Sequence, residues 1–383
     1  MNQFLRRSAD RANITAIGAA LRLLSLPPAL RYARERLEHA GMILMFHHVA
    51  PKRANRLGVN TGLEVTPETL EGVLTSMKAQ NYDIISMDEV PERLVRARSD
   101  QRRFAALTFD DGGRDNLIHA APILQRHGAP FTIYVTTSFA SGLIAPWWYV
   151  IERATMAASS LMIDDGHEPR RFDTADHRRK AQAADALRDI MWRANEPLRA
   201  RQTADLARQA GLDLCALTRD LYMDWTELSE IAALPGCTIG AHTATHANLA
   251  RLDDKSAMRE IVEARDIIRE RLKVEVNHFS YPYGAVGCCD TREYEFARQA
   301  GFATAVTTRR GVLASYDFDG LACLPRVPIN GHYQHPQMID ALVSGLPMVL
   351  GARTSALLAH IKRSLRVPGK PNNHPRRLWE KRT

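Results

Sequence analysis

The chain has 383 residues, of which 45% are hydrophobic and 25% charged, and this composition excludes a disordered, collagen-like or coiled-coil protein. The formal net charge of +8 resides at the two ends, because residues 353–383 hold nine Lys or Arg against one acid and residues 1–41 hold seven Arg against three acids. The middle of the chain is therefore acidic on balance, and the basic total does not indicate a nucleic-acid-binding body.

Neither a membrane span nor a signal peptide is predicted. The most apolar stretch, residues 14–30, is interrupted by Arg22 and lacks a clear small-residue cleavage site. The five cysteines are odd in number and form no C-x-x-C pair, which argues against a disulfide framework or a thiolate zinc site. These features favour the cytoplasm, with membrane association through the basic termini as the alternative.

Hydrophobic runs and helical periodicities alternate along most of the chain. The first helix is expected after Thr66, with Pro67 at its first position and apolar residues spaced as an amphipathic stripe at Leu70, Val73, Leu74 and Met77. Further helices are expected at 117–127, 255–272 and 292–300. Strands are expected at 43–46, 84–85, 104–109, 131–135, 237–241, 277–281, 303–307 and 321–327.

This alternation predicts an α/β fold, namely a distorted TIM-like (β/α) barrel of seven or eight parallel strands. The alternation stops between about residues 146 and 235, where we expect a helical insertion. The expected organisation is a basic helical N-terminal segment (1–40), the barrel with its insertion (41–345) and a basic C-terminal tail (346–383).

Three clusters of polar or turn residues follow predicted strands, where a parallel barrel places its active site. One carboxylate and two imidazoles from the first two clusters would make the three-ligand set of a catalytic zinc-type site. The third cluster could aim a backbone N–H inward. The clusters are Thr108-Phe109-Asp110-Asp111-Gly112, His242-Thr243-Ala244-Thr245-His246 and Ser280-Tyr281-Pro282-Tyr283-Gly284.

In this order and setting, the three motifs resemble those of polysaccharide deacetylases with a NodB-homology domain, carbohydrate esterase family four. The run Ile43-Leu44-Met45-Phe46-His47 also resembles the first strand of many members, and the likeness covers about residues 40–330. The resemblance implies a hydrolase that removes N-acetyl groups from an amino-sugar polysaccharide or oligosaccharide.

The resemblance also implies roles for particular residues. Asp111, His242 and His246 would bind a divalent metal ion, with zinc as the first expectation, and Asp110 would be the catalytic base. Tyr283 would supply a backbone N–H to the oxyanion.

Two departures from the family pattern leave roles open. Ser280 or Tyr281 stands where the family has an arginine that orients the base, and Arg326 at another strand end is the hypothetical replacement. No late motif with a catalytic-acid histidine is visible. His47 is the better-placed candidate, and the weaker ones are His332, His335 and His360.

The sequence also allows other interpretations. Trp147 and Trp148 could stack on sugar rings or pack in the core. The expected partner is an acetylated amino-sugar glycan, with no nucleic acid and at most a weak membrane-surface contact through the basic termini. The alternatives are a catalytically inactive glycan-binding barrel, an O-acetyl esterase acting on a cell-surface polysaccharide, or a membrane-surface or nucleic-acid binder driven by the termini.

Overall fold

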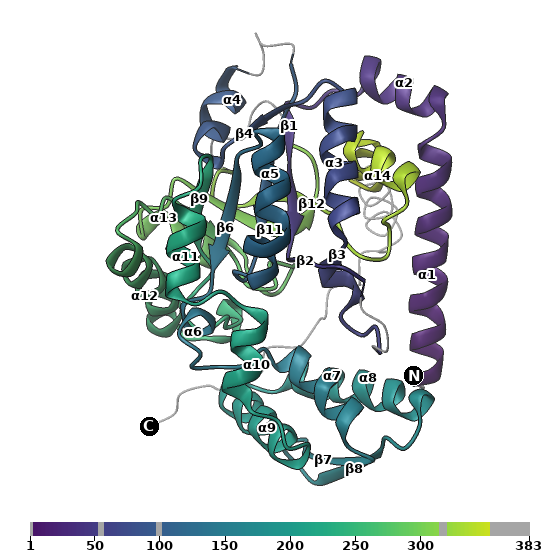
Figure 1. Cartoon of the computed structure of the whole chain (residues 1–383), viewed down its shortest axis with the longest axis vertical. Coiled ribbons are helices and arrows are strands. Elements are labelled where there is room, and N and C mark those ends of the chain that lie inside the picture. Colours follow the sequence, from purple (N-terminus) through teal and green to yellow (C-terminus); the bar gives the residue numbers. More distant parts are fainter. Residues whose placement is uncertain (1–2, 53–56, 97–101, 314–319, 353–383) are drawn as a thin grey trace, which may run out of the picture.

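The computed structural model describes residues 3–52, 57–96, 102–313 and 320–352. Seven parallel strands form a closed barrel in the order β1, β12, β11, β10, β9, β6, β5, because β5 pairs back with β1 (Figure 1). An eighth strand, β4 (Asp83–Ile85), pairs with the first half of β5. The predicted (β/α) barrel of seven or eight strands is therefore confirmed. The barrel strands are β1 (Gly41–Phe46), β5 (Phe104–Phe109), β6 (Phe131–Val135), β9 (Cys237–Ala241), β10 (His278–Ser280), β11 (Thr304–Arg310) and β12 (Leu324–Pro328).

Helices cover the outside of the barrel. The first, α3 (Pro67–Ala79), begins as predicted, since the Thr66 side chain accepts a hydrogen bond from the Thr69 N–H and Pro67 is the first helical residue. The four apolar residues of its stripe are buried against the barrel. The others are α4 (Val90–Arg96), α5 (Ala121–His127), α11 (Trp225–Ala232), α12 (Asp254–Leu272), α13 (Thr291–Gln299) and α14 (Pro336–Val343).

Short elements connect these strands and helices. A π-helical turn, Asn116–Ala120, precedes α5, and α6 (Thr137–Ala140) follows β6. A separate two-stranded pairing joins β2 (His48–Val49) to β3 (Glu64–Val65). Single 3-10 turns lie at Thr61–Leu63, Met87–Glu89 and Leu249–Arg251.

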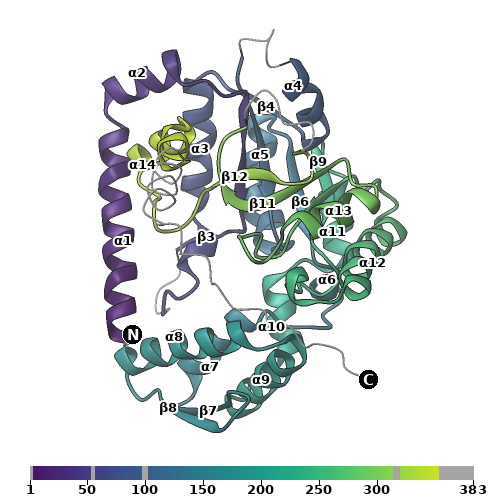
Figure 2. The same ribbon diagram turned by 180° about the vertical axis from the view of Figure 1, so that it is seen from behind.

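The insertion lies across the end of the barrel at which the strands finish (Figures 1 and 2). It has its own apolar core, which includes the fully buried Leu161, Leu187 and Leu206. The sequence predicted a helical insertion here, and the segment is mainly helical, but a β-hairpin that was not predicted, β7 (Ser160–Asp164) with β8 (Pro169–Asp173), interrupts the helices. The helices are α7 (Trp147–Ala157), α8 (His177–Arg193), α9 (Glu196–Gln209) and α10 (Leu214–Leu221).

The N-terminal helices α1 (Gln3–Leu24) and α2 (Pro27–Arg36) stand outside the barrel. In both views α1 runs along one side of the molecule, from the level of the barrel toward the insertion (Figures 1 and 2). It packs against α14 at Gly18, where an added Cβ would lie 3.4 Å from the Met338 side chain. Among the described residues no single helix is long and apolar enough to cross a membrane; the segments Ala12–Leu24 and Pro27–Arg36 pass that test only as a pair bent by 75°.

Part of the predicted basic tail is described. Residues 346–352 are helical, and Leu346 packs with Ala33 and Leu37 of the α2 region. The rest of the tail, including the candidate His360, lies outside the described residues.

Candidate active site

Two acids and two histidines from distant parts of the chain meet at the end of the barrel. Asp110 and Asp111 directly follow β5, and His242 directly follows β9. The Oδ1 atom of Asp111 lies 3.3 Å from Nε2 of His242 and 3.3 Å from Nε2 of His246. One ligand atom from each of these three buried residues lies within 4.8 Å of the others. The structure thus brings together the three side chains that the motifs suggested as metal ligands.

The backbone around these residues adopts uncommon conformations. Positive φ angles occur at Asp111 (74°), Thr243 (62°), His246 (58°) and Tyr283 (62°), which are four of the six non-glycine residues with positive φ in the described chain. Such conformations cost about 1 kcal/mol or more each and persist where the surrounding structure enforces them. Their concentration at one place indicates a site shaped for function rather than for stability.

The chemistry of the three side chains fits a divalent metal ion. Nδ1 of His242 lies 2.7 Å from the carbonyl oxygen of Ser280, so the N–H is on Nδ1 and the lone pair of Nε2 faces Asp111. The Oδ1 atom of Asp111 is buried without a hydrogen-bond partner. One carboxylate oxygen and two imidazole nitrogens match the protein ligands of catalytic zinc sites.

The imidazoles also explain the ionisation of Asp111. Burial by itself would raise the pKa of this carboxyl, but the positive charge and N–H hydrogen bonds of the His246 and His242 rings, in their protonated form, outweigh burial and hold the pKa well below its ordinary value. Asp111 is therefore a carboxylate over the whole physiological range.

Arg326 holds the second acid of the pair. Its guanidinium donates from Nη1 to Oδ1 of Asp110 (2.8 Å) and from Nη2 to Oδ2 (2.6 Å), and the arginine side chain is fully buried. Its Nε donates to the carbonyl oxygen of Thr307, and Nη2 lies 3.2 Å from Oγ of Ser280. Burial alone would raise the pKa of Asp110, but the charge of Arg326 lowers it below its ordinary value. The structure thus places the guanidinium of Arg326 against both oxygens of the Asp110 carboxylate.

Of the described histidines that were candidates for the catalytic acid, one lines the cavity and two do not. Nε2 of His47 lies 4.0 Å from Oδ2 of Asp110, and His47 lines the same cavity. Burial lowers the pKa of His47, so its imidazole is neutral near pH 7. His332 and His335 are exposed and do not line this cavity; the His335 ring instead accepts a hydrogen bond from the Gln337 N–H at the start of α14.

Aromatic side chains close the site on the side of the insertion. The indole N–H of Trp147 donates to the Tyr283 hydroxyl (3.0 Å), and the Tyr283 ring lies 4.9 Å from the His246 ring. Trp147 and Trp148 are only 8% and 7% exposed, so they pack in the core of the insertion while also lining the cavity. Packing in the core of the insertion is therefore confirmed for this pair, and stacking on sugar rings stays a prediction.

Helix α8 supplies a wall of the site that the sequence did not reveal. The cavity has a volume of about 490 Å³, and Arg188, Asp189 and Trp192 of α8 line it. Trp192 is 37% exposed, and its ring lies edge-to-face with Tyr283 at 5.0 Å. The only available signal was an aromatic residue directly after the apolar Ile190 and Met191 of a predicted helix, which does not show what the residue faces.

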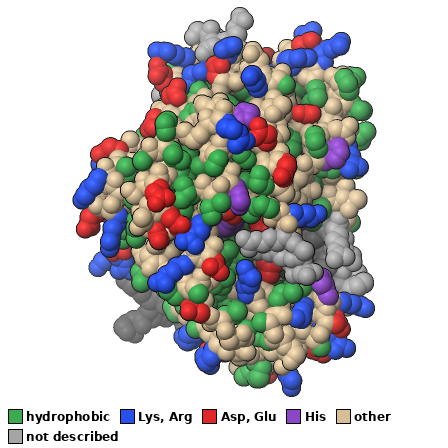
Figure 3. Space-filling view, viewed as in Figure 1, with side chains coloured by type: hydrophobic (Ala, Val, Ile, Leu, Met, Phe, Trp, Pro, Cys, Tyr) green, Lys and Arg blue, Asp and Glu red, His purple; other side chains and the backbone are tan. Residues whose placement is uncertain are grey.

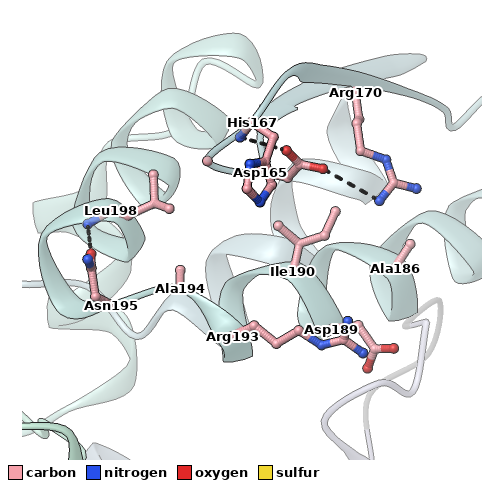
Figure 4. A pocket seen from close by; sticks show the side chains of 11 residues that line it. Asp165, His167, Arg170, Ala186, Asp189, Ile190, Arg193, Ala194, Asn195 and Leu198 are labelled. Carbon is pink, nitrogen blue, oxygen red and sulfur yellow. Dashed lines mark hydrogen bonds and ion pairs between the residues drawn. The ribbon is translucent and has the colours of Figure 1, made fainter.

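A second cavity, of about 780 Å³, lies beyond α8 within the insertion, and Asp189 lines it as well. Figure 4 shows it between the turn of the β7–β8 hairpin and the junction of α8 with α9. The carboxylate of Asp165 accepts a hydrogen bond from the His167 N–H and lies 3.8 Å from Arg170. The negative charge of Asp165 is therefore largely satisfied within the hairpin.

The comparisons with known proteins agree with this geometry. A family model described as polysaccharide deacetylase matches residues 97–305. No curated protein sequence matches the chain significantly.

Solved structures with similar folds share little sequence with the chain. A polysaccharide deacetylase of Bacillus cereus is 15% identical over 79% of this chain and 68% of its own, with a TM-score of 0.50, and this likeness shows the fold. A Streptococcus pyogenes deacetylase in complex with acetate is 19% identical over 76% of this chain and 92% of its own, with a TM-score of 0.48. IcaB of Ammonifex degensii is 16% identical over 80% and 97%, with a TM-score of 0.49.

Proposed function

Because this chain belongs to the polysaccharide deacetylase family, we propose that it is a metal-dependent hydrolase that removes N-acetyl groups from an amino-sugar glycan. The observation that carries the proposal is the placement of the Asp110–Arg326 pair beside the group formed by Asp111, His242 and His246. A base held next to three metal-ligating side chains is the arrangement that amide hydrolysis by water requires.

Asp111, His242 and His246 would hold the ion. A divalent metal, with zinc as the expected one, would there lower the pKa of a water molecule and polarise the acetyl carbonyl. The hydrogen bond from Nδ1 of His242 to Ser280 keeps the other ring nitrogen available as a ligand.

Asp110 acts as the base in this proposal. It takes a proton from the attacking water, whose oxygen adds to the acetyl carbon, and the C–N bond then breaks to give acetate and a free amine on the sugar. The two hydrogen bonds from Arg326 fix the plane of the carboxylate and leave its other lone pairs open to water.

Tyr283 and His47 complete the assignment. The backbone N–H of Tyr283 is proposed as a donor to the oxyanion. The positive φ of Tyr283 supports this role, because uncommon backbone conformations concentrate at functional sites. His47 starts as a neutral imidazole and is proposed to pass to the leaving amine the proton that Asp110 takes from water, because its Nε2 lies 4.0 Å from Oδ2 of Asp110 and it lines the same cavity.

An acetate-release assay tests the proposal. The zinc-loaded protein should release acetate from acetylated chito-oligosaccharides, and Asp110→Asn should lower kcat/KM by at least about 10²-fold while one equivalent of zinc remains bound. Release from O-acetylated xylan alone would instead identify an esterase. A wild-type protein that binds zinc but releases no acetate from either glycan would contradict the proposal and favour an inactive glycan-binding barrel.

A further inference from the structure

Residues 12–24 of the N-terminal helix α1 present an almost uncharged, largely exposed surface. Between residues 12 and 24 the only charged side chain is that of Arg22. Ile17 is 37% exposed and Leu23 is 66% exposed, and Leu26 directly beyond the helix is 50% exposed. Figure 3 shows hydrophobic side chains open to solvent along the edge of the molecule that α1 and α2 form. Exposed apolar residues gathered on one element mark a binding surface.

An apolar groove lies between α1 and α14. Its volume is about 790 Å³, larger than that of the catalytic cavity. Among the described residues, the polar side chains in its lining are those of Arg310, Asn330 and Tyr333. The apolar residues that define it include Ile17, Ala20, Leu21, Leu24, Leu342 and Met348.

The groove adjoins the catalytic cavity. Pro328, at the end of β12, and Asn330 line both spaces. Pro328 comes only two residues after Arg326, which holds the proposed base. A molecule with its acetylated sugar beside Asp110 could therefore pass Asn330 and extend an attached chain between α1 and α14.

One charged side chain lines the groove, and further arginines lie on the helix beside it. Arg310, at the end of β11, is exposed and lines the groove. Arg31, Arg34 and Arg36 lie on α2 next to α1. Helical segments with exposed apolar residues and nearby arginines bind to anionic membrane surfaces.

The geometry points to a glycolipid as the substrate: an acetylated amino sugar joined to a long hydrocarbon chain, with the sugar in the catalytic cavity and the chain in the groove. This inference rests on the proposed function and names its substrate class. Because each methylene buried in an apolar site strengthens binding roughly fourfold, the length of the hydrocarbon chain governs affinity.

A series of alkyl N-acetyl-β-glucosaminides tests the inference. The methyl, octyl and dodecyl compounds are compared below their critical micelle concentrations, by calorimetric binding and by acetate release. The dodecyl compound should bind at least tenfold more tightly than the octyl compound, and kcat/KM should rise in the same order. Equal binding of the two compounds would overturn the inference.

A matched pair of variants tests whether the hydrocarbon chain lies in the groove. Ala20→Trp fills the groove, whereas Ala19→Trp adds the same ring at the neighbouring exposed position of α1 that does not line it. Ala20→Trp should reduce the dodecyl-to-octyl affinity ratio to about that expected for a blocked groove, near one, and Ala19→Trp should retain the wild-type ratio. Equal ratios for the two variants would contradict the inference.

Two other occupants of the groove give recognisable results. If a photo-cross-linker at Leu23 captures residues 353–383 of the same chain, the groove holds the chain's own C-terminal segment and the inference fails. If Ala20→Trp halves the mass measured by light scattering, the groove holds a second copy and the inference fails as well. Dodecyl-dependent binding without acetate release would support the groove and contradict the proposed function, whereas acetate release without dependence on chain length would do the reverse.

Discussion

Arg326, in the middle of β12, donates hydrogen bonds to both carboxylate oxygens of Asp110, the residue directly after β5, and the two residues are separated by 216 positions in the chain. The same guanidinium lies 3.2 Å from Oγ of Ser280 on β10. By the resemblance of the motifs, an arginine was expected near Ser280, and here the guanidinium beside Ser280 comes from β12. The barrel allows this because its parallel strands, including the non-adjacent β5, β10 and β12, all end at one face.

Replacing Arg326 should impair both catalysis and folding. Arg326→Met leaves Asp110 as an unpaired buried charge, and we expect the free energy of unfolding to fall by about 3–5 kcal/mol. Arg326→Lys keeps a positive charge but cannot form two parallel hydrogen bonds. It should therefore fold, while its kcat/KM falls by at least about tenfold, since the base is no longer held in one plane. Urea unfolding and acetate release measure the two effects.

A second arginine–carboxylate pair provides the control. Nε of Arg114 contacts both oxygens of Glu227 at 2.8 and 3.0 Å, outside the catalytic cavity. Arg114→Lys should leave kcat/KM within about twofold of the wild-type value, because surface pairs of this kind contribute little. A fully active Arg326→Lys enzyme would show that the pairing has no part in catalysis.

The three-residue group should bind metal and gain stability from it. Zinc at a hundred times its dissociation constant should raise the free energy of unfolding by about 2.7 kcal/mol. Asp111→Asn removes the only carboxylate of the group and should weaken zinc binding by about tenfold to a hundredfold. Competition with a chromophoric chelator measures the affinity, and thermal unfolding with and without zinc measures the stabilisation.

Asp115→Asn is the matched change for this experiment. Asp115 also pairs with a histidine, since its Oδ2 lies 2.9 Å from Nδ1 of His48, but it is not part of the three-residue group. Its replacement should preserve the zinc affinity. Equal losses of affinity in Asp111→Asn and Asp115→Asn would assign the metal to some other set of ligands.

Much of the barrel was predictable from local pattern. The bounds of β5, β6 and β9 coincide with the predicted strands, because each is a short, mostly buried run bounded by turn residues. The hairpin of the insertion escaped prediction: its strands are short and partly exposed, and β8 is rich in charge. Its turn depends on Gly166 with φ 94° and on Asp165, whose Oδ1 accepts the N–H groups of His167 and Glu168.

The site was predictable where a motif carries it and not where tertiary packing does. Asp111, His242 and His246 follow strands that the pattern identifies, so their convergence could be expected. The approach of Trp192 to Tyr283 could not, because a helical period shows which residues share a face but not what an exposed residue lies against. Pairing of Arg326 with Asp110 could be proposed only as a hypothesis, since it depends on the order of strands in the closed barrel.

Two tryptophans at the cavity should respond differently to removal. Trp192 is 37% exposed, so Trp192→Ala should raise the KM for acetylated chito-oligosaccharides by roughly twofold to twelvefold, through loss of a stacking surface worth roughly 0.5–1.5 kcal/mol, with little change in unfolding temperature. Trp148 is 7% exposed, and Trp148→Ala should cost about 3–5 kcal/mol of stability. Steady-state kinetics and calorimetry separate the two; an unchanged KM in Trp192→Ala would remove the residue from the substrate surface.

The stability of the fold should depend on pH through His39, which lies away from the catalytic cavity. Burial, followed by repulsion from Arg103, lowers the pKa of His39 from 6.5 to about 4. Its Nδ1 lies 3.3 Å from the carbonyl oxygen of Gly41 and its Nε2 lies 3.3 Å from the Tyr82 hydroxyl, so the neutral ring bridges β1 and the start of β4.

Between pH 6.5 and 4 the unfolded chain binds a proton at His39 that the folded chain does not. The stabilisation from the neutral ring is therefore complete above pH 6.5, and up to about 3 kcal/mol of it is lost as the pH falls to 4. His39→Gln cannot titrate, so its free energy of unfolding should decline less steeply over this range. Urea unfolding at half-unit intervals of pH measures both slopes, and parallel curves for the two proteins would show that His39 titrates alike in the folded and unfolded states.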